Sequence, residues 1–200
     1  MPGFSKSIYK NMDLPDLIRS AQKNNYAAIE ELIKREQKNI YASFCYLGAE
    51  NESISDLTQE VLLRMSKNIK NLKNPKLFKS WLGQIVTHLF YDELRKQQRH
   101  PAAVSIDSFW KDDEDDGSLN ICDTHLKPDE TTAGRELTDI IRKMICALPE
   151  HFKIVIVLRE LQGLSYEEIA DITKTNVGTV KSRIARARSK LQECLKPYVA

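Results

Sequence analysis

The segment from residue 165 to residue 195 constrains the fold more than any other part of the chain. Ser165 and Glu168 have the spacing of a capping box, which opens a helix. The triplet 174–176 then interrupts the apolar pattern, and Asn176 is a favourable N-cap for a second helix. A short helix, a tight turn and a second helix predict a helix-turn-helix, whose second helix can enter the major groove of DNA.

The second helix of this motif has an apolar stripe and, opposite to it, a face of small residues. At about 100° per residue the stripe that we expect to be buried consists of Val180, Ile184, Ala187 and Leu191. The small residues on the opposite face are Gly178, Ser182, Ala185 and Ser189. Lys181 and Arg186 flank this face, Arg183 and Arg188 lie nearer its edges, and residues 174–190 include no acid. Small central side chains and flanking cations suit a DNA groove, whereas the alternative is an ordinary solvated basic face.

Helical periodicity divides the chain into an N-terminal extension (1–12), a helical part (13–100), a linker (101–133) and a second helical part (134–200). The linker lacks an apolar stripe and contains a run of acidic residues at 112–116. These patterns predict an all-α fold of two small helical domains joined by a flexible acidic linker. The extension has no assignable role.

Apolar patterns also predict individual elements. An amphipathic stripe covers 28–47, a second helix begins near Ser55, and a third extends over about 78–99. The polar segment 68–78 predicts a loop or short turn. The β-branched run 154–157 stands in a window of helical spacing, which favours a buried helix over a strand.

Composition limits the other functional classes. The net charge of +2 does not by itself indicate a nucleic-acid binder, so the distribution of charge carries the argument. No apolar stretch reaches the roughly 18 residues needed to cross a bilayer, and the N-terminus lacks a signal-peptide core, which predicts a cytoplasmic protein.

Sites for metal, cofactor or catalysis are not expected. The four cysteines include no CxxC pair, and the histidines and cysteines lack metal-ligand spacing. No glycine-rich phosphate loop or nucleophile elbow is present in the sequence. We therefore predict a protein without enzyme activity, cofactor, metal or small-molecule substrate.

Two parts of the chain resemble a known family. The stretch 148–191, and VGTVKSRIARAR within it above all, resembles region 4 of extracytoplasmic-function (ECF) sigma factors of the sigma-70 family. DLTQEVLLRM (56–65) and KSWLGQIVTHLFYDELRK (79–96) resemble region 2 of the same family. The resemblance implies a sigma factor that binds core RNA polymerase and directs promoter-specific transcription initiation, with region 2 in 13–100 and region 4 in 134–200.

The resemblance also implies three groups of site residues. Those expected at the −35 element are Arg159, Asn176, Gly178, Thr179, Lys181, Ser182, Ala185, Arg186 and Arg188. Those expected at the melted −10 element are Asn71, Lys73, Asn74, Lys76, Phe78, Lys79, His88 and Arg95. Those expected to bind core polymerase are Asp56, Leu57, Gln59, Glu60 and Leu63.

Alternatives remain for several of these residues. Loop lysines can be merely solvated, and Trp81 is a better candidate for the core than for stacking on a base. His88 stands where the family usually has Asn, so either it alters the −10 preference or it is a partly buried residue without a role.

The partners implied by the resemblance are core RNA polymerase (its clamp coiled coil and flap), promoter DNA and an anti-sigma factor, in a stress response. An anti-sigma factor could hold the protein at the membrane. Two other functional classes compete with this interpretation. A free-standing regulator would use the same helix-turn-helix, but it usually dimerises and carries a sensor domain. An enzyme would need the sites excluded above.

Overall fold

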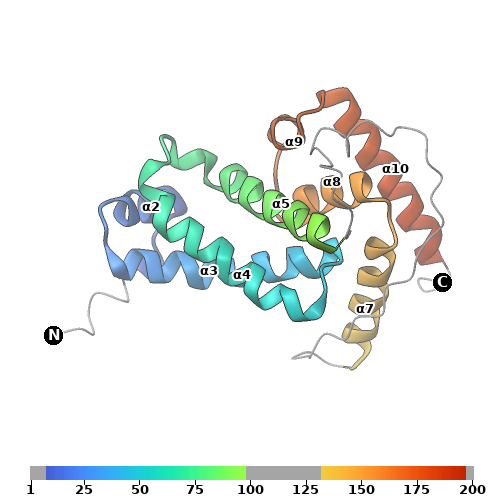
Figure 1. The fold of residues 1–200 in the computed structure, drawn as a ribbon, viewed down its shortest axis with the longest axis horizontal. Coiled ribbons are helices and arrows are strands. Elements are labelled where there is room, and N and C mark those ends of the chain that lie inside the picture. The colour runs from blue at the N-terminus through green and yellow to red at the C-terminus, as the bar shows by residue number, and fades with distance from the viewer. Residues whose placement is uncertain (1–7, 98–131, 197–200) are drawn as a thin grey trace.

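The computed structural model describes residues 8–97 and 132–196, and every regular element in these two ranges is a helix (Figure 1). The first half contains α2 (Leu14–Gln22), α3 (Tyr26–Leu47), α4 (Asn51–Asn68), the 3₁₀ turns η1 (Ile69–Asn71) and η2 (Pro75–Leu77), and α5 (Phe78–Gln97). The second half contains α7 (Thr132–Cys146), α8 (Glu150–Glu160), α9 (Tyr166–Thr173) and α10 (Val177–Leu195). The prediction of an all-α fold is confirmed.

The predicted helices and the polar loop recur in the structure, except that α4 begins at Asn51, before the predicted start near Ser55. The polar segment 68–78 contains only the two short turns, and the β-branched run 154–157 is helical and buried within α8. The predicted linker lies outside the described residues except for its last two, which begin α7. Among the described helices, none is long and apolar enough to cross a membrane.

Local chemistry explains where α3 begins and ends. The side chain of Asn25 accepts hydrogen bonds from the backbone N–H groups of Ala27 and Ala28, which caps the N-terminus. At the other end Gly48 adopts φ 83°, a left-handed conformation that favours glycine, and stops the helix. The resulting helix is long enough to contact both halves of the molecule.

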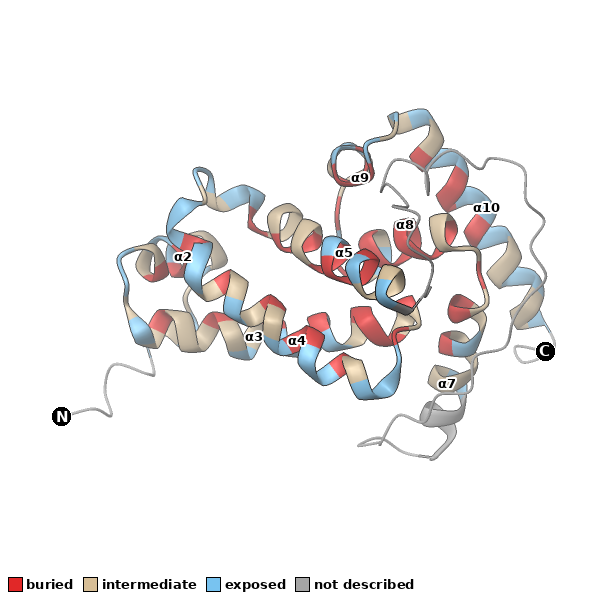
Figure 2. Ribbon diagram, in the orientation of Figure 1, coloured by how far each residue is buried: buried red, intermediate tan, exposed pale blue. Residues whose placement is uncertain are grey.

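The two halves pack directly against each other. Helix α3 contacts α7 and α8, and α5 contacts α9. The buried apolar residues of both halves form one continuous cluster, which Figure 2 shows along the facing sides of these helices. Fully buried members include Phe44 and Phe90 of the first half and Val155 and Ile169 of the second.

Gly83 allows the close approach of α5 to the second half. A Cβ at this position would lie 3.1 Å from Leu164 Cδ1 and 3.4 Å from both Ile172 Cδ1 and Leu158 Cδ2. The glycine destabilises the helix by about 1 kcal/mol relative to alanine, but it allows three apolar side chains to approach the backbone of α5.

Polar groups also occupy the interface between the halves. Gln162 Nε2 donates to Ser43 Oγ at 2.8 Å, and Cys146 Sγ donates to the carbonyl of Cys45 at 3.4 Å. Burial raises the pKa of the Cys45 thiol to about 11. Arg142 of α7 is also buried here, at 1% exposure. A partly polar interface of this kind is typical of domains that can separate.

Enlarging Gly83 should weaken the contact between the halves. We expect Gly83→Leu to cost about 1–3 kcal/mol through overpacking and to increase the radius of gyration in small-angle scattering. Gly83→Ala is the matched control: it needs only a small shift of the Leu164 side chain and gains helix propensity. Equal radii of gyration for the two variants would contradict this expectation.

Candidate nucleic-acid interface

The helix-turn-helix has the local geometry predicted from the sequence. Ser165 Oγ accepts from the Glu168 N–H at 3.1 Å, and Glu168 Oε2 accepts from the Ser165 N–H at 2.8 Å, which completes the capping box. Lys174 ends α9 in the left-handed region at φ 50°. Asn176 Oδ1 then caps α10 by accepting from the Thr179 N–H at 2.7 Å.

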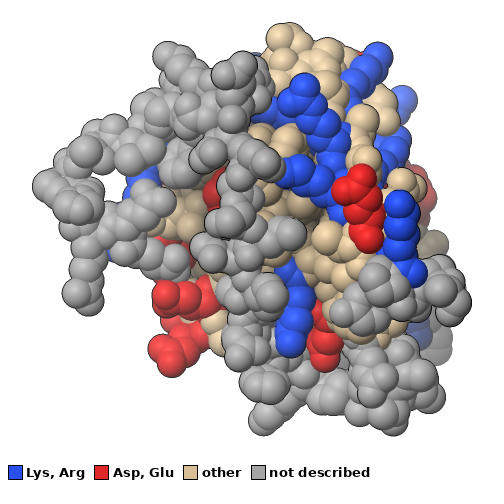
Figure 3. Space-filling view, turned by 90° about the vertical axis from the view of Figure 1, so that its right-hand side faces the viewer, with Lys and Arg blue, Asp and Glu red and all other residues tan. Residues whose placement is uncertain are grey.

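The two faces of α10 separate as expected. Val180, Ile184 and Ala187 are buried, with 0–1% exposure, and Leu191 is partly buried. The exposed residues on the outer face are Gly178, Lys181, Ser182, Ala185, Arg186 and Ser189. Figure 3 shows Lys and Arg side chains gathered on this side of the molecule. The helix thus presents a basic surface with small residues at its centre.

The ring of Tyr166, the first residue of α9, contacts side chains from both α8 and α10 at the edge of this surface. The Arg159 guanidinium lies 4.8 Å from the centre of the Tyr166 ring, and Lys181 Nζ lies 5.9 Å from it. Arg159 Nη1 also donates to the carbonyl of Leu164 at 2.6 Å. Two of the predicted −35 residues are therefore held around one aromatic ring, which the sequence analysis did not single out.

The two arginines expected at the edges of the α10 face differ. Arg183 is 2% exposed, so its placement near an exposed edge is wrong. It lies near Tyr91 of α5. Burial and the nearby Glu150 raise the pKa of Tyr91, and Arg183 offsets only part of this effect. Arg188 stays exposed but donates to Glu160 Oε1 at 2.6 Å, and this hydrogen bond raises the pKa of Arg188.

The loop of η1 and η2 presents a second basic surface. Its exposed polar side chains are Lys67, Asn68, Lys70, Asn71, Lys73, Asn74 and Lys76. Asn74 Oδ1 caps η2 by accepting from the Lys76 N–H at 3.0 Å, so this side chain also has a structural task. Leu77 is 50% exposed, which its sequence does not indicate, because a leucine beside Phe78 has the pattern of a core residue.

Two residues assigned to this surface are engaged elsewhere. Phe78 is fully buried and its ring lies 6.1 Å from that of Trp81, so it supports the loop from the core, which corrects its assignment as a DNA contact. Lys79 Nζ donates to both carboxylate oxygens of Glu36, at 2.7 and 2.8 Å. Glu36 is 3% exposed, so Lys79 neutralises a buried charge.

Along α5, His88 is exposed, as a base contact requires. Arg95 is half-buried and pairs with Asp92 at 2.9 Å. Helix α4 carries the residues expected to bind polymerase. Of these, Asp56, Gln59 and Leu63 are exposed and Glu60 is partly exposed. Leu57 is 7% exposed and belongs to the core, which corrects its assignment to the binding surface.

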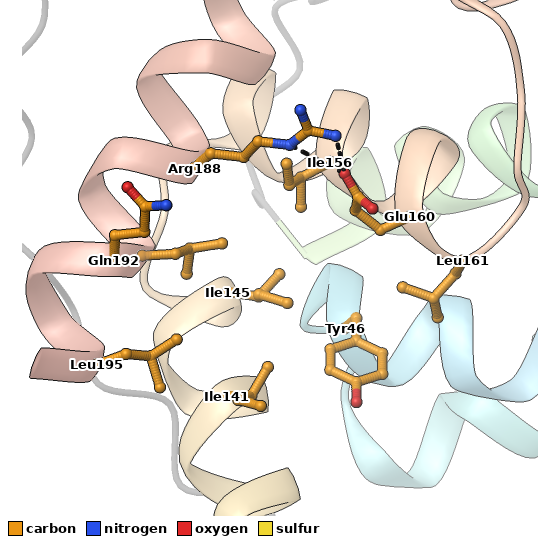
Figure 4. Close-up of a pocket in the computed structure, with 10 residues that line it drawn as sticks. Tyr46, Ile141, Ile145, Ile156, Glu160, Leu161, Arg188, Gln192 and Leu195 are labelled. Atoms are coloured by element: carbon orange, nitrogen blue, oxygen red, sulfur yellow. Dashed lines mark hydrogen bonds and ion pairs between the residues drawn. The ribbon is translucent and has the colours of Figure 1, made fainter. Parts of the chain in front are cut away.

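A groove of about 360 Å³ lies between α7, α8 and α10, with Tyr46 of α3 at its edge (Figure 4). Its apolar wall consists of Ile141, Ile145, Ile156, Leu161, Leu191 and Leu195. The Arg188–Glu160 ion pair lies on its rim. An apolar groove with a charged rim is the shape that receives an amphipathic helix.

Comparison with known proteins gives this arrangement a family. Residues 32–100 match the family model described as Sigma-70 region 2, and residues 138–191 match the one described as Sigma-70, region 4. The ECF RNA polymerase sigma-E factor of Escherichia coli K12 is 31% identical over 184 residues, which covers 92% of this chain and 94% of that protein. The chain is an ECF sigma factor of the sigma-70 family. The sigma-E factor of Haemophilus influenzae is 32% identical, over 92% of this chain and 95% of its own length.

Two solved structures share the fold. CnrH in complex with the cytosolic domain of CnrY matches 92% of this chain and 97% of that chain, with a TM-score of 0.63 and 20% identity. The sigma factor RpoE of Bartonella quintana, in complex with the anti-sigma factor NepR, matches 84% of this chain and 96% of that chain, with a TM-score of 0.61 and 24% identity. As a sigma factor, this protein directs promoter-specific transcription initiation.

Proposed function

We propose that this sigma factor binds core RNA polymerase and reads a promoter through two separate surfaces. Region 4 reads the −35 element with α10, and region 2 captures the melted −10 element with the η1–η2 loop and α5. The observation that carries the proposal is the capped α9–α10 pair, whose outer face is exposed, basic and small at its centre. A recognition helix in the major groove needs such a face.

At the −35 element, Lys181, Ser182, Ala185 and Arg186 contact base edges, and Asn176, Gly178 and Thr179 bring the start of α10 to the backbone. Arginine and lysine pair favourably with guanine O6 and N7. Arg159 and Arg188 contact phosphate from the edges, because their internal bonds to Leu164 and Glu160 limit their reach.

At the −10 element, the single strand is held by the exposed loop residues Asn71, Lys73, Asn74 and Lys76, followed along α5 by His88 and Arg95. Cationic grooves bind unpaired strands, and amide groups can read a base that has left the stack. Lys79 adds charge near this path, but its first role is to neutralise Glu36.

Polymerase is bound through two faces of the chain. The exposed residues Asp56, Gln59, Glu60 and Leu63 of α4 bind the clamp coiled coil, and the apolar groove beside α10 receives the flap. Neither contact requires catalysis, so the protein acts as a specificity subunit without an enzyme activity of its own. Its site of action is the cytoplasm, where polymerase and promoter DNA are found.

The domain boundaries proposed from sequence are 13–100, 101–133 and 134–200, after the extension 1–12. A linker of 101–133 can extend to about 100 Å, which allows the halves to separate on a promoter. The sigma factor RpoE of Bartonella quintana, which has the same fold, was solved with the anti-sigma factor NepR bound. We therefore assign an anti-sigma partner to this chain as well. Such a partner can hold the sigma factor at the membrane and release it under stress.

Reconstitution with core RNA polymerase tests this function. The protein should co-migrate with core polymerase and support specific initiation from a subset of a random promoter library, which also yields its −10 and −35 sequences. A free-standing regulator, the alternative, would bind duplex DNA as a dimer without core polymerase. Failure to co-migrate with core polymerase would falsify the proposal.

A further inference from the structure

The side chain of Gln22 ties the N-terminal helix to the loop assigned to the −10 element. Its Nε2 donates to the carbonyl of Leu72 at 2.6 Å and to the carbonyl of Ile69 at 3.2 Å. A glutamine amide has two N–H donors, so one side chain can satisfy both carbonyls. The bonded residues are 47 and 50 positions apart from Gln22 in the chain, so this is a tertiary contact.

These two carbonyls define where the loop bends. Ile69 begins η1, and Leu72, with φ −71° and ψ 107°, is the point at which the chain leaves it. The Leu72 N–H also closes the turn by donating to the Ile69 carbonyl at 3.2 Å. The Ile69 carbonyl therefore accepts from both Leu72 and Gln22, whereas the Leu72 carbonyl lies where the turn ends. A side-chain donor at the end of a helical turn fixes the direction of the next residues.

Helix α2 is a firm base for this contact. Leu17, Ile18 and Ala21 are 0–1% exposed, and α2 packs against both η1 and η2. The segment before α2 is held from α3, where Arg35 donates to the carbonyls of Met12 at 2.8 Å and Tyr9 at 2.6 Å. Gln22 follows directly on the buried part of α2, so its position is set by the core.

Beyond the anchored turn, the regular structure of the loop is the three-residue turn η2. The exposed side chains that it presents there are Lys73, Asn74, Lys76 and Leu77. Reading a base needs donors within a fraction of an ångström of a set position, which a loop achieves only when its backbone is fixed. Binding phosphates by charge tolerates more movement.

We propose that Gln22 is a positioning residue for −10 recognition, which acts by fixing the bend at Ile69–Leu72. The inference rests on the proposed assignment of the loop to the −10 element. Loss of the amide keeps the lysines of the loop but no longer fixes their positions. Non-specific affinity for DNA and its salt dependence therefore persist. Discrimination between −10 sequences falls by about tenfold, the effect of one or two lost hydrogen bonds.

The test uses holoenzyme reconstituted with Gln22→Met, which keeps the side-chain length and removes both donors. Initiation is measured on a promoter selected by the wild-type holoenzyme, on its single-base −10 variants and on its −35 variants. The expected result is a −10 preference profile flattened about tenfold and an unchanged −35 profile. Arg19→Met, at an exposed position of the same helix, is the matched control and should keep both profiles.

Two further variants separate the possible failures. Lys73→Ala combined with Lys76→Ala removes the two exposed lysines that follow the anchored turn. If this double variant initiates as well as the wild type, the −10 assignment fails and the inference falls with it. If this double variant weakens initiation while Gln22→Met keeps the wild-type −10 profile, only the inference is overturned. An equal loss on all promoters also overturns it, since that indicates general destabilisation. Should Gln22→Met unfold at a lower temperature, Gln22→Asn, which keeps the amide but shortens its reach, takes its place with the same expected profile.

Discussion

Replacing Lys79 with methionine is expected to lower the free energy of unfolding by about 3–5 kcal/mol. The Lys79 ammonium is bound by both carboxylate oxygens of Glu36, and the Glu36 side chain is only 3% exposed. Without Lys79 the carboxylate remains buried and unpaired, and such a charge costs much more than the pair itself contributes. Denaturant unfolding monitored by circular dichroism measures the change.

The reverse substitution provides the control. Glu36→Gln should cost less than Lys79→Met, because the Lys79 side chain is 34% exposed and its ammonium can be hydrated. The double variant should recover most of the stability, since it buries no unpaired charge. If both single variants lower the free energy of unfolding equally, the difference in burial between Glu36 and Lys79 does not determine the cost.

This prediction also affects how DNA-binding data for Lys79 are read. A single Lys79 variant is expected to lose −10 binding whether or not the lysine contacts DNA. Its loss destabilises the start of α5 and with it the loop that precedes α5. Initiation measured with the double variant, in which stability is restored, separates a contact from a structural effect.

Arg186→Ala is expected to reduce initiation from a promoter with a matched −35 element by about 5- to 150-fold, the equivalent of one bidentate base contact. Arg186 is exposed on the outer face of α10, beside the small residues Ser182 and Ala185. The loss should disappear on a promoter whose −35 element has been scrambled, because there is then no base contact to lose. Initiation assays on the two promoters measure it.

Arg188→Ala is the matched control on the same helix. Its guanidinium is bound to Glu160 in an exposed ion pair, which contributes about 0–1 kcal/mol, so we expect a loss of less than about fivefold. If Arg188 contacts a phosphate, its removal reduces the slope of log binding constant against log salt concentration by about one, and does so for all sequences. Equal losses for Arg186 and Arg188 on the matched promoter would refute the assignment of Arg186 to base reading.

Much of the helix-turn-helix could be predicted because its determinants are local. Caps involve residues within three positions of each other, as with Ser165 and Glu168, and the stripe of Val180 and Ile184 follows from helical periodicity alone. The exposed face of small and basic residues follows from the same rotation. Family resemblance then connected this face to a promoter element.

Errors arose where a residue's environment depends on a distant element. Helical projection puts Arg183 near the edge of the exposed face, but Arg183 is buried near Tyr91 of α5. Leu57 follows the exposed Asp56 and Phe78 follows the exposed Leu77, yet their own side chains are buried. The periodicity of one helix does not indicate which other helices pack against it.

The sequence by itself determined the helical class, the capped recognition motif and the family, because these depend on short-range spacing and on recurrent motifs. Only the tertiary structure decided that the halves share one core through Gly83, that Lys79 neutralises Glu36, and that Gln22 binds the carbonyl of Leu72. Each of these contacts joins residues more than 40 positions apart in the chain. Such pairs form when whole helices pack, so their existence depends on the arrangement of all the helices rather than on any local pattern.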